Sequence, residues 1–449
     1  MDYQVAIIGG GPAGYTAAEK AGKSGLKVIL FEKEKIGGVC LNEGCIPTKT
    51  LLYSAKLYQQ ALDSKPYGIS IPEASFDIKR MVSRKNKTTR KLTLGINNKL
   101  KEAQVTIVQG AARIVDPHTI QCNGESYTFD NLLICTGSLS ITPPIKGLSD
   151  ITYWTHKEAL EVKELPQSLI IIGGGVIGME FASLYNSLGV DVTIIEQMDE
   201  LLGNMDKELT ALLREEYSKK KLTCLLNTTV TAVEPTEENK VVVHYENSEG
   251  KQTAVADQLL LSVGRKPQLA DLGLENIELD KTEQGRIKIN RQMQTSQPHI
   301  FLCGDANGKS LLAHTAIREA EVAVHTLLSK EDAMNYQAIP SVIYTNPEFA
   351  GVGETEESLK AKEIEYRKVT LSLAYSGRFV AENERTNGVC KLLFSKDDTL
   401  LGAHVLGNPA SEIITLAGMA IELGLTAEEW NQCIFPHPTV GEIFKEALQ

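Results

Sequence analysis

The chain has 449 residues, of which 42% are hydrophobic and 23% charged, and its formal net charge is −11. This length exceeds a single hydrophobic core, so about two to four domains are expected. The acidic balance argues against nucleic acid as the main partner, and no apolar stretch is long enough to predict a membrane span. An apolar strand pattern begins at Val5, so no signal peptide is expected, and the eight scattered cysteines favour a reducing, cytoplasmic location.

The first predicted element is a strand that leads into a glycine-rich turn. Residues 4–14 read QVAIIGGGPAG, which places Gly9, Gly11 and Gly14 in a G-x-G-x-x-G pattern. A helical pattern follows, and then a second apolar run, LKVILFE, that ends at Glu32. In a dinucleotide site these glycines allow a tight turn, close approach of the pyrophosphate and close helix packing, while the acid binds ribose hydroxyls. One copy alone could also be an ordinary glycine turn.

The next segment, residues 37–49, reads GGVCLNEGCIPTK and contains Cys40 and Cys45. A zinc site lacks nearby partners, and so short a loop would constrain little of the unfolded chain. The sequence after Cys45 predicts a helix, which would place this thiol at a helix N-terminus, where a thiolate is stabilised. A regular helix would separate the two Cα atoms by about 7.5 Å, too far for a disulfide, so Cys40 must lie in a loop or the helix must be distorted. Two inert thiols and a redox pair both remain open at this point.

A basic stretch follows at residues 79–92, KRMVSRKNKTTRKL. As a helix it would turn Ile78, Met81 and Val82 inward and its cations outward. The main interpretation is a solvated face, and the alternative is a docking surface for an acidic partner.

The glycine pattern occurs a second time. Residues 168–178 read SLIIIGGGVIG, with Gly173, Gly175 and Gly178, and the run VDVTIIE ends at Glu196. The last glycine and the acid are 18 residues apart in both copies (32 − 14 and 196 − 178). Two copies with matched strands, helices and acids predict two dinucleotide sites. No Arg or Lys occurs between Glu196 and Lys207, so the second site should prefer NAD over NADP.

Three further buried strands are predicted to end in glycine turns, at residues 130–138, 258–267 and 299–308, the last with Asp305 just beyond it. Ligands bind at the carboxyl ends of strands in such sheets. From about residue 336 the pattern changes to alternating strands and one helix, which predicts a separate α+β domain.

Near the C-terminus, FPHPTVGE contains His437 between two prolines and Glu442 five residues later. A carboxylate at this spacing could bind one ring nitrogen and leave the other for proton transfer, although a lone histidine is more often structural.

Taken together, these motifs resemble the flavin-dependent pyridine nucleotide–disulfide oxidoreductases over essentially the whole chain. The form CLNEGCIPTK is similar to the lipoamide enzymes of that family, as is the NAD-type second site. Phe435-Pro436 stands where those enzymes commonly have His-Ala. The resemblance implies an α/β chain with two Rossmann-like domains, for FAD and NAD, and a C-terminal α+β dimerisation domain. The implied bounds are 1–145 and 265–335 for FAD, 146–264 for NAD and 336–449 for the interface.

The resemblance also implies roles for individual residues. Cys40 would meet substrate and Cys45 the flavin, Lys49 would lie near the flavin and pair with Glu180, and His437 with Glu442 would serve the other subunit. The implied cofactor-binding residues are Gly9, Gly11, Gly14, Glu32, Lys49, Ala112, Thr136, Gly137, Ser138, Gly173, Gly175, Gly178, Glu196, Gly264, Asp305, Ala313 and His314, with no metal.

The implied activity is oxidation of protein-bound dihydrolipoamide by a Cys40–Cys45 disulfide and FAD, with reduction of NAD+, in a homodimer whose partner is the lipoyl domain of a multienzyme complex. One alternative is a sibling reductase for glutathione or another small thiol. The other is a docking subunit of a 2-oxo-acid dehydrogenase complex, with residues 79–92 as the surface to test.

Overall fold

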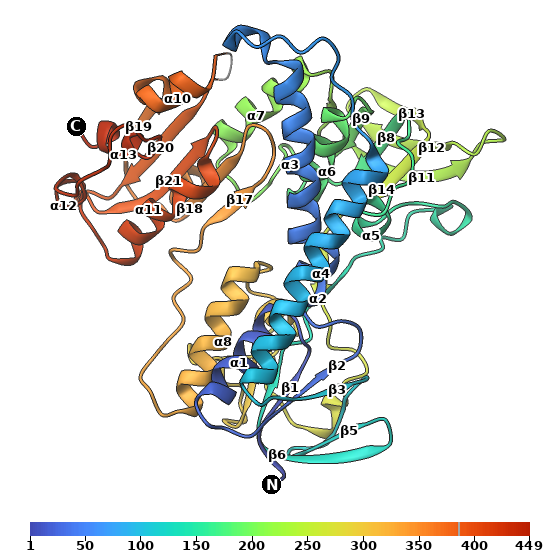
Figure 1. Cartoon of the computed structure of the whole chain (residues 1–449), viewed down its shortest axis with the longest axis vertical. Helices are drawn as coiled ribbons and strands as arrows, with labels where there is room; N and C mark the ends of the chain where they lie inside the picture. The colour runs from blue at the N-terminus through green and yellow to red at the C-terminus, as the bar shows by residue number, and fades with distance from the viewer. Residues whose placement is uncertain (385–386) are drawn as a thin grey trace. The chain divides into compact units, whose positions relative to one another are not determined.

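The computed structural model describes residues 1–384 and 387–449 (Figure 1). The chain divides into two compact units, each assembled from segments distant in sequence. The first unit comprises Met1–Thr50, Val82–Ile141 and Gly264–Asn335, and the second comprises Leu51–Met81, Thr142–Val263 and Tyr336–Gln449.

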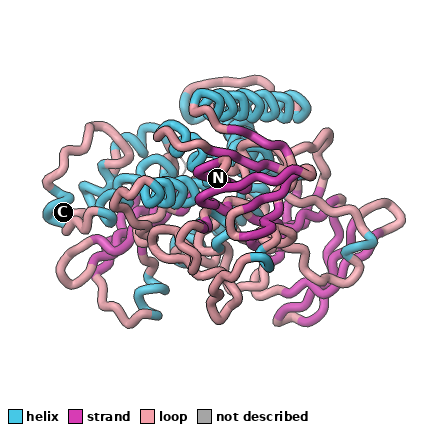
Figure 2. The backbone as a smooth tube through the Cα atoms, turned by 90° about the horizontal axis from the view of Figure 1, so that it is seen from below, coloured by secondary structure: helices cyan, strands magenta, loops and turns pink. Residues whose placement is uncertain are grey.

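A parallel sheet forms the centre of the first unit, in the order β3-β2-β1-β6, with β16 paired to β6 as well. Its strands are β1 (Tyr3–Ile8), β2 (Val28–Glu32), β3 (Thr106–Gln109), β6 (Glu125–Ile134) and β16 (Ile300–Leu302). The N-terminus lies beside these strands (Figure 2). Helices α1 (Pro12–Lys23) and α8 (Ala313–Leu327) lie side by side (Figure 1). Strands β1, β2 and β16 and the C-terminal end of β6 are almost fully buried, as their apolar runs predict, whereas the edge strand β3 is mostly exposed.

Smaller elements complete the first unit. An antiparallel pair, β4 (Arg113–Asp116) and β5 (Thr119–Cys122), extends from the start of β6, and β7 (Ser138–Ser140) pairs with β15 (Arg265–Pro267). The sequence-predicted strands near residues 130 and 300 are confirmed as β6 and β16.

The second unit contains a parallel sheet with the equivalent order β10-β9-β8-β14. Its strands are β8 (Ser168–Ile172), β9 (Asp191–Ile195), β10 (Thr223–Leu225) and β14 (Gln258–Leu261). Beside it are an antiparallel meander, β11 (Thr229–Pro235), β12 (Val241–Asn247) and β13 (Gly250–Ala256), and helices α5 (His156–Ala159), α6 (Val176–Ser187) and α7 (Lys207–Lys219). The strand–helix–strand duplication read from the sequence is therefore present in the fold.

The C-terminal part of the second unit is an antiparallel sheet in the order β17-β18-β21-β20-β19. The strands are β17 (Ser341–Ile343), β18 (Phe349–Gly353), β19 (Arg367–Ser372), β20 (Val389–Phe394) and β21 (Leu400–Leu406). The helices are α9 (Glu356–Ala361), α10 (Gly377–Glu382), α11 (Ala410–Glu422), α12 (Ala427–Asn431) and α13 (Glu442–Ala447). Helix α11 packs on β18 and β21. The alternating strands and the helix predicted after residue 336 are confirmed.

Three helices follow the first glycine turn and its second strand: α2 (Gly38–Glu43), α3 (Cys45–Leu62) and α4 (Ile78–Glu102). Short 3₁₀ helices occur at Lys65–Tyr67, Leu148–Asp150, Leu274–Asn276, Gly304–Asn307 and Leu373–Tyr375. None of the helices within residues 1–384 and 387–449 is long and apolar enough to cross a membrane.

Helix α4 carries the basic stretch and corrects one expectation. Met81 is buried and Ile78 and Val82 are half-buried, as predicted, but Lys85 is only 1% exposed and does not belong to the outward face. Lys85 follows Met81 by four residues, so it shares the buried stripe of the helix, and its aliphatic stem can be covered there.

Candidate functional site

The first glycine loop joins β1 to α1 and has the shape of a phosphate cradle. Gly9 has a φ of +103°, which favours glycine, and a Cβ on Gly14 would overlap the carbonyl oxygen of Gly9. A Cβ on Gly11 would meet nothing closer than the Cα of Gly38 at 3.8 Å, so the backbone at Gly11 is open. The first and third glycines are therefore required by the protein itself, and the second leaves room that a pyrophosphate can use.

Glu32, at the end of β2, is held against this loop. Its Oε2 accepts a hydrogen bond of 2.6 Å from the amide of Gly10, and its Oε1 accepts one of 2.7 Å from the amide of Glu34. A carboxylate has about four acceptor positions, so each oxygen keeps capacity for a ribose hydroxyl. The residue predicted to bind ribose is thus fixed in place by the backbone.

The second glycine loop joins β8 to α6 and repeats this geometry. Gly173 also has a φ of +103°, a Cβ on Gly178 would overlap the oxygen of Gly173, and a Cβ on Gly175 would meet nothing within 4 Å. Glu196 accepts 2.6 Å from the amide of Gly174 and 2.8 Å from that of Met198. Both loops therefore fit a dinucleotide by the same physical test.

The cations near the second loop are engaged in ion pairs. Lys207 Nζ lies 2.6 Å from Asp199, and Arg214 binds both oxygens of Glu200 at 2.9 Å. A ribose 2′-phosphate would have to compete with these carboxylates, which agrees with a preference for NAD.

The cysteine segment is fastened to the first glycine loop. The amide of Gly37 donates to the oxygen of Gly10 at 2.8 Å, and Gly38 packs so closely on Gly11 that a Cβ there would lie 2.7 Å from the Gly11 Cα. Both Gly37 and Gly38 have positive φ, so the turn depends on glycine.

Cys40 and Cys45 lie in two different helices. Cys40 is in α2, not in a loop, and Gly44 interrupts the helical conformation before α3 begins at Cys45. Both residues are half-buried. A side-chain hydrogen bond to Cys45, together with burial and the charge of Cys45, raises the pKa of Cys40 far above its ordinary value. The break therefore brings the two sulfurs together, as a continuous helix would not.

The two sulfurs have unequal surroundings. Cys45 is at the N-terminus of an 18-residue helix, where the helix dipole favours negative charge. Lys49 follows it by four residues on the same helix face, and its charge opposes the rise in the pKa of Cys40. In the reduced pair, Cys45 is therefore the better site for a thiolate and Cys40 for a proton.

Tyr15, which the sequence analysis did not single out, also lies near these sulfurs. Burial raises its pKa to about 12, with further contributions from Cys40 and Cys45. The phenol therefore remains protonated at neutral pH. Its position directly after Gly14 was the only signal in the sequence.

A buried polar network joins two of the strand exits. Ser138 Oγ donates to Asp305 at 2.5 Å and accepts from Arg265 Nε at 2.8 Å, while Arg265 Nη2 donates to the Ser138 carbonyl at 2.7 Å. Burial raises the pKa of Asp305 and lowers that of Arg265. The network holds Asp305 at the edge where the cofactor is expected. Arg265 was missed by the sequence analysis, although an arginine four residues after the end of a buried strand was a signal.

The remaining residues predicted for the first cofactor belong to the same unit. Thr136 donates its hydroxyl to the carbonyl of Gln268 at 2.6 Å, and Gly137 and Gly264 both have positive φ. Ala112 is buried, and Ala313 and His314 begin helix α8. All the residues predicted for the first cofactor therefore lie in one unit. Their direct contacts with that cofactor stay a prediction.

His437 and Glu442 form the predicted hydrogen bond. His437 Nδ1 lies 2.9 Å from Glu442 Oε1, and the amide of Thr439 donates to Glu442 Oε2 at 2.7 Å. The bond from Thr439 lowers the pKa of Glu442, and His437 lowers it further. The His437 side chain is 80% exposed, so its Nε2 side is accessible for proton transfer.

These two residues belong to the second unit, whereas the cysteines and Lys49 belong to the first. Glu180, predicted to pair with Lys49, is also in the second unit, where its Oε1 accepts from the amide of Tyr344 at 3.1 Å. Both the Lys49–Glu180 pair and the service of His437 to a cysteine pair stay predictions. Across residues 1–384 and 387–449, no three His, Cys, Asp or Glu side chains are placed to hold a metal ion.

Comparison with known proteins agrees with this geometry. Residues 3–320 match the family described as Pyridine nucleotide-disulphide oxidoreductase, and residues 339–448 match its dimerisation domain. The chain is 38% identical to a protein named dihydrolipoyl dehydrogenase from Mycoplasma pneumoniae, over 100% of this chain and 98% of that protein. It is also 38% identical to a protein of the same name from Geobacillus stearothermophilus, over 100% and 96% of the two chains.

Among solved structures, the HOCl-induced flavoprotein disulfide reductase RclA from Escherichia coli aligns over 99% of both chains, with a TM-score of 0.88 and 28% identity. These matches confirm the predicted fold class and the predicted class of enzyme, an oxidoreductase that uses FAD and NAD. The chain belongs to the pyridine nucleotide–disulphide oxidoreductase family.

Proposed function

We propose that this chain is a dihydrolipoyl dehydrogenase, which oxidises a protein-bound dihydrolipoamide and reduces NAD+. The observation that carries the proposal is the pair Cys40 and Cys45, placed in adjacent helices and fastened to a dinucleotide loop through Gly37 and Gly38. The relatives named dihydrolipoyl dehydrogenase support the choice of substrate.

In the oxidised enzyme, Cys40 and Cys45 form a disulfide. His437 takes a proton from one substrate thiol, and the thiolate attacks the Cys40 sulfur, so that the Cys40–Cys45 bond breaks and Cys45 leaves as a thiolate. The second substrate thiol then attacks the substrate sulfur bound to Cys40, and the proton that it loses passes to the departing Cys40 sulfur. Lipoamide leaves with its new S–S bond, and Cys40 is released as a thiol. When bound, FAD and NAD+ would supply the acceptors for the two electrons of the dithiol.

The chain's own residues favour this order. The N-terminus of α3 and Lys49 stabilise Cys45 as a leaving thiolate, and the raised pKa of Cys40 makes it the sulfur that regains a proton. Glu442 orients His437 through Nδ1, which leaves Nε2 for the substrate.

The dimerisation domain at residues 339–448 supports a homodimer. We propose that, in this homodimer, His437 and Glu442 of one subunit act on the disulfide of the other subunit. We further propose that residues 1–145 and 265–335 bind FAD, that residues 146–264 bind NAD and that residues 336–449 form the interface. The lipoyl-domain partner and the cytoplasmic location stay predictions.

An anaerobic titration of the purified yellow protein tests the function. Stoichiometric dihydrolipoamide should produce the long-wavelength charge-transfer band of a Cys45 thiolate beside oxidised flavin, and NADH should produce it at lower concentrations than NADPH. Absence of the band with dihydrolipoamide would refute the assignment. Turnover with glutathione above that with lipoamide would instead support the sibling reductase.

A further inference from the structure

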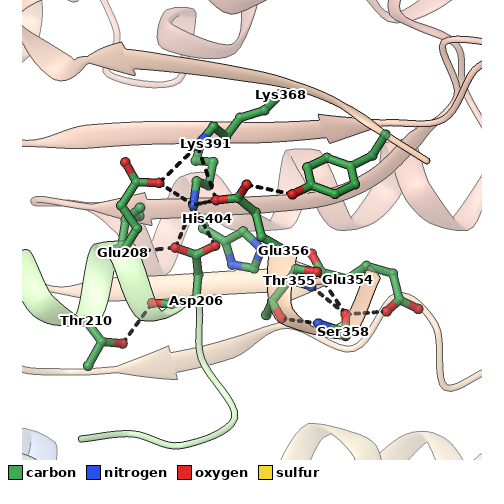
Figure 3. Close-up of polar contacts among 12 residues, drawn as sticks. Asp206, Glu208, Thr210, Glu354, Thr355, Glu356, Ser358, Lys368, Lys391 and His404 are labelled. Atoms are coloured by element: carbon green, nitrogen blue, oxygen red, sulfur yellow. Dashed lines mark hydrogen bonds and ion pairs between the residues drawn. The ribbon is translucent and has the colours of Figure 1, made fainter. Parts of the chain in front are cut away.

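A buried ion cluster in the second unit takes no part in the proposed chemistry. Its centre is Lys391 of β20, whose side chain has no exposed surface. Lys391 Nζ donates to both oxygens of Asp206 at 2.9 and 2.8 Å and to Glu356 at 2.7 Å, and it lies 2.6 Å from Glu208 (Figure 3). Three carboxylates therefore converge on one ammonium group.

The members of the cluster come from two distant parts of the sequence. Asp206 and Glu208 stand at the start of α7, in the segment predicted to bind NAD. Lys391 and Glu356 belong to the C-terminal sheet and to helix α9, and Lys368 of β19 also contacts Glu356 at 3.2 Å. The cluster thus links the start of α7 to the C-terminal sheet through ion pairs.

Of the two lysines labelled in Figure 3, Lys391 is fully buried, whereas the side chain of Lys368 is 39% exposed. His404 is buried next to Lys391, but its Nε2 contacts the carbonyl of Glu354 at 2.9 Å. Its Nδ1 has no hydrogen-bond partner in the described part of the chain, and a Cβ on Gly351 would lie 2.6 Å from it. Burial lowers the pKa of His404, so it adds no positive charge at neutral pH. Without Lys391, Asp206 would be a buried carboxylate with no cation.

Asp206 ends the segment that follows Glu196. The amide of Leu202 donates to the carbonyl of Gly174 at 3.0 Å, and the Leu201 side chain packs directly on Gly174. Asp206 Oδ1 then caps α7 by accepting from the amide of Leu209 at 3.2 Å. Residues 197–206 are therefore held near their middle by the second glycine loop and at their C-terminal end by Lys391.

We propose that Lys391 is a positioning residue for the second dinucleotide site: from the C-terminal sheet it fixes residues 197–206 beside Glu196 and so sets the affinity for NAD. The inference rests on the proposed function only in assigning NAD to this site. It does not depend on which disulfide the enzyme turns over.

The test compares Lys391→Met with Lys396→Met. Lys396 lies just after β20, pairs with Glu365 at 2.5 Å and is 72% exposed, so it is a matched control outside the cluster. Lys391→Met should raise KM for NAD+ about tenfold, as expected if the competent loop is populated about a tenth of the time. Its kcat at saturating NAD+ and its anaerobic flavin reduction by dihydrolipoamide should be unchanged. Hydrogen exchange in residues 197–206 should be faster without any NAD present.

Unchanged KM and unchanged exchange in a folded Lys391→Met protein would overturn the inference, even if its Tm falls, because a purely structural role moves only Tm. Should that variant not fold, Asp206→Asn decides, since it keeps the size and the helix cap but removes the charge facing Lys391. The same rise in KM supports the inference, and no rise overturns it. Flavin reduction by NADH gives the same comparison if dihydrolipoamide proves not to be the substrate.

Discussion

The second and third glycines of one loop should fail in different ways when each is replaced by alanine. A Cβ on Gly178 would overlap the oxygen of Gly173 and would lie 2.8 Å from Ser262 Oγ. A Cβ on Gly175 would meet nothing within 4 Å. The backbone at Gly175 is extended, with a φ of −71°, and the equivalent Gly11 has a φ of −75°. Gly178→Ala is therefore a perturbation of packing, and Gly175→Ala is a perturbation of the ligand space.

The expected magnitudes follow from these contacts. Overpacking against rigid backbone costs about 1–3 kcal/mol or more, and Gly178→Ala should be at the upper end, offset by about 1 kcal/mol from the better helix propensity of alanine. A net loss of about 2 kcal/mol lowers Tm by roughly 4–8 °C for a domain of about 150–250 residues. Gly175→Ala changes only the helix N-cap, at a cost of about 1 kcal/mol or less. Its KM for NAD+ should nevertheless rise at least about tenfold, because the methyl group occupies the approach of the pyrophosphate.

Differential scanning calorimetry and steady-state kinetics on the two variants separate these effects. Gly377→Ala is a suitable control, since a Cβ there also meets nothing within 4 Å and Gly377 lies outside both glycine loops and outside residues 197–206. An unchanged KM for NAD+ in Gly175→Ala would refute the cradle, and an unchanged Tm in Gly178→Ala would refute the packing argument.

Three further predictions concern the cysteines, the histidine and the ion cluster. Cys40→Ser should keep a long-wavelength thiolate band that Cys45→Ser loses, because Cys45 has the helix N-terminus; the opposite result in absorbance spectra would reverse the two roles. His437→Gln should abolish dihydrolipoamide oxidation but spare electron transfer from NADH to a dye, and an equal loss of both would contradict its role as the base. Burial raises the pKa of Glu356, but hydrogen bonds from Lys391 and other donors outweigh this and lower it to about 2. The contribution of Glu356 to the free energy of unfolding is therefore complete above its ordinary pKa of 4.5 and is lost as the pH falls from there toward 2. In urea unfolding, the free energy of unfolding of Lys391→Met should depend less on pH over this range than that of the unsubstituted protein.

Local patterns predicted the duplicated strand–helix–strand units well, because glycine positions and apolar runs are set by contacts within about thirty residues. Glu32 lies at the end of its strand and Glu196 directly after its own, as expected. Glu32 accepts from the amide of Gly10, and Glu196 accepts from the amide of Gly174. The hydrogen bond between His437 and Glu442 was also within reach, since the two are five residues apart.

Long-range polar contacts could not be predicted in this way. Lys391 reads as one charge in the apolar strand VCKLLF, and nothing nearby indicates that Asp206, 185 residues earlier, is its partner. Lys85 looked like another solvated cation of a basic helix, yet it is buried. Cys40 was expected in a loop or a distorted helix, and the separate short helix α2 was not foreseen because six residues carry little periodicity.

The two glycine loops use one anchoring atom for different purposes. The carbonyl oxygen of Gly10 accepts from Gly37 at the start of the cysteine segment, and the equivalent oxygen of Gly174 accepts from Leu202 in a segment without cysteines. The cysteine segment therefore occupies a position that the other copy fills with a loop without cysteines. The two copies thus share their parallel sheet order and their phosphate cradle, and the cysteine pair is carried entirely by the connection in which they differ.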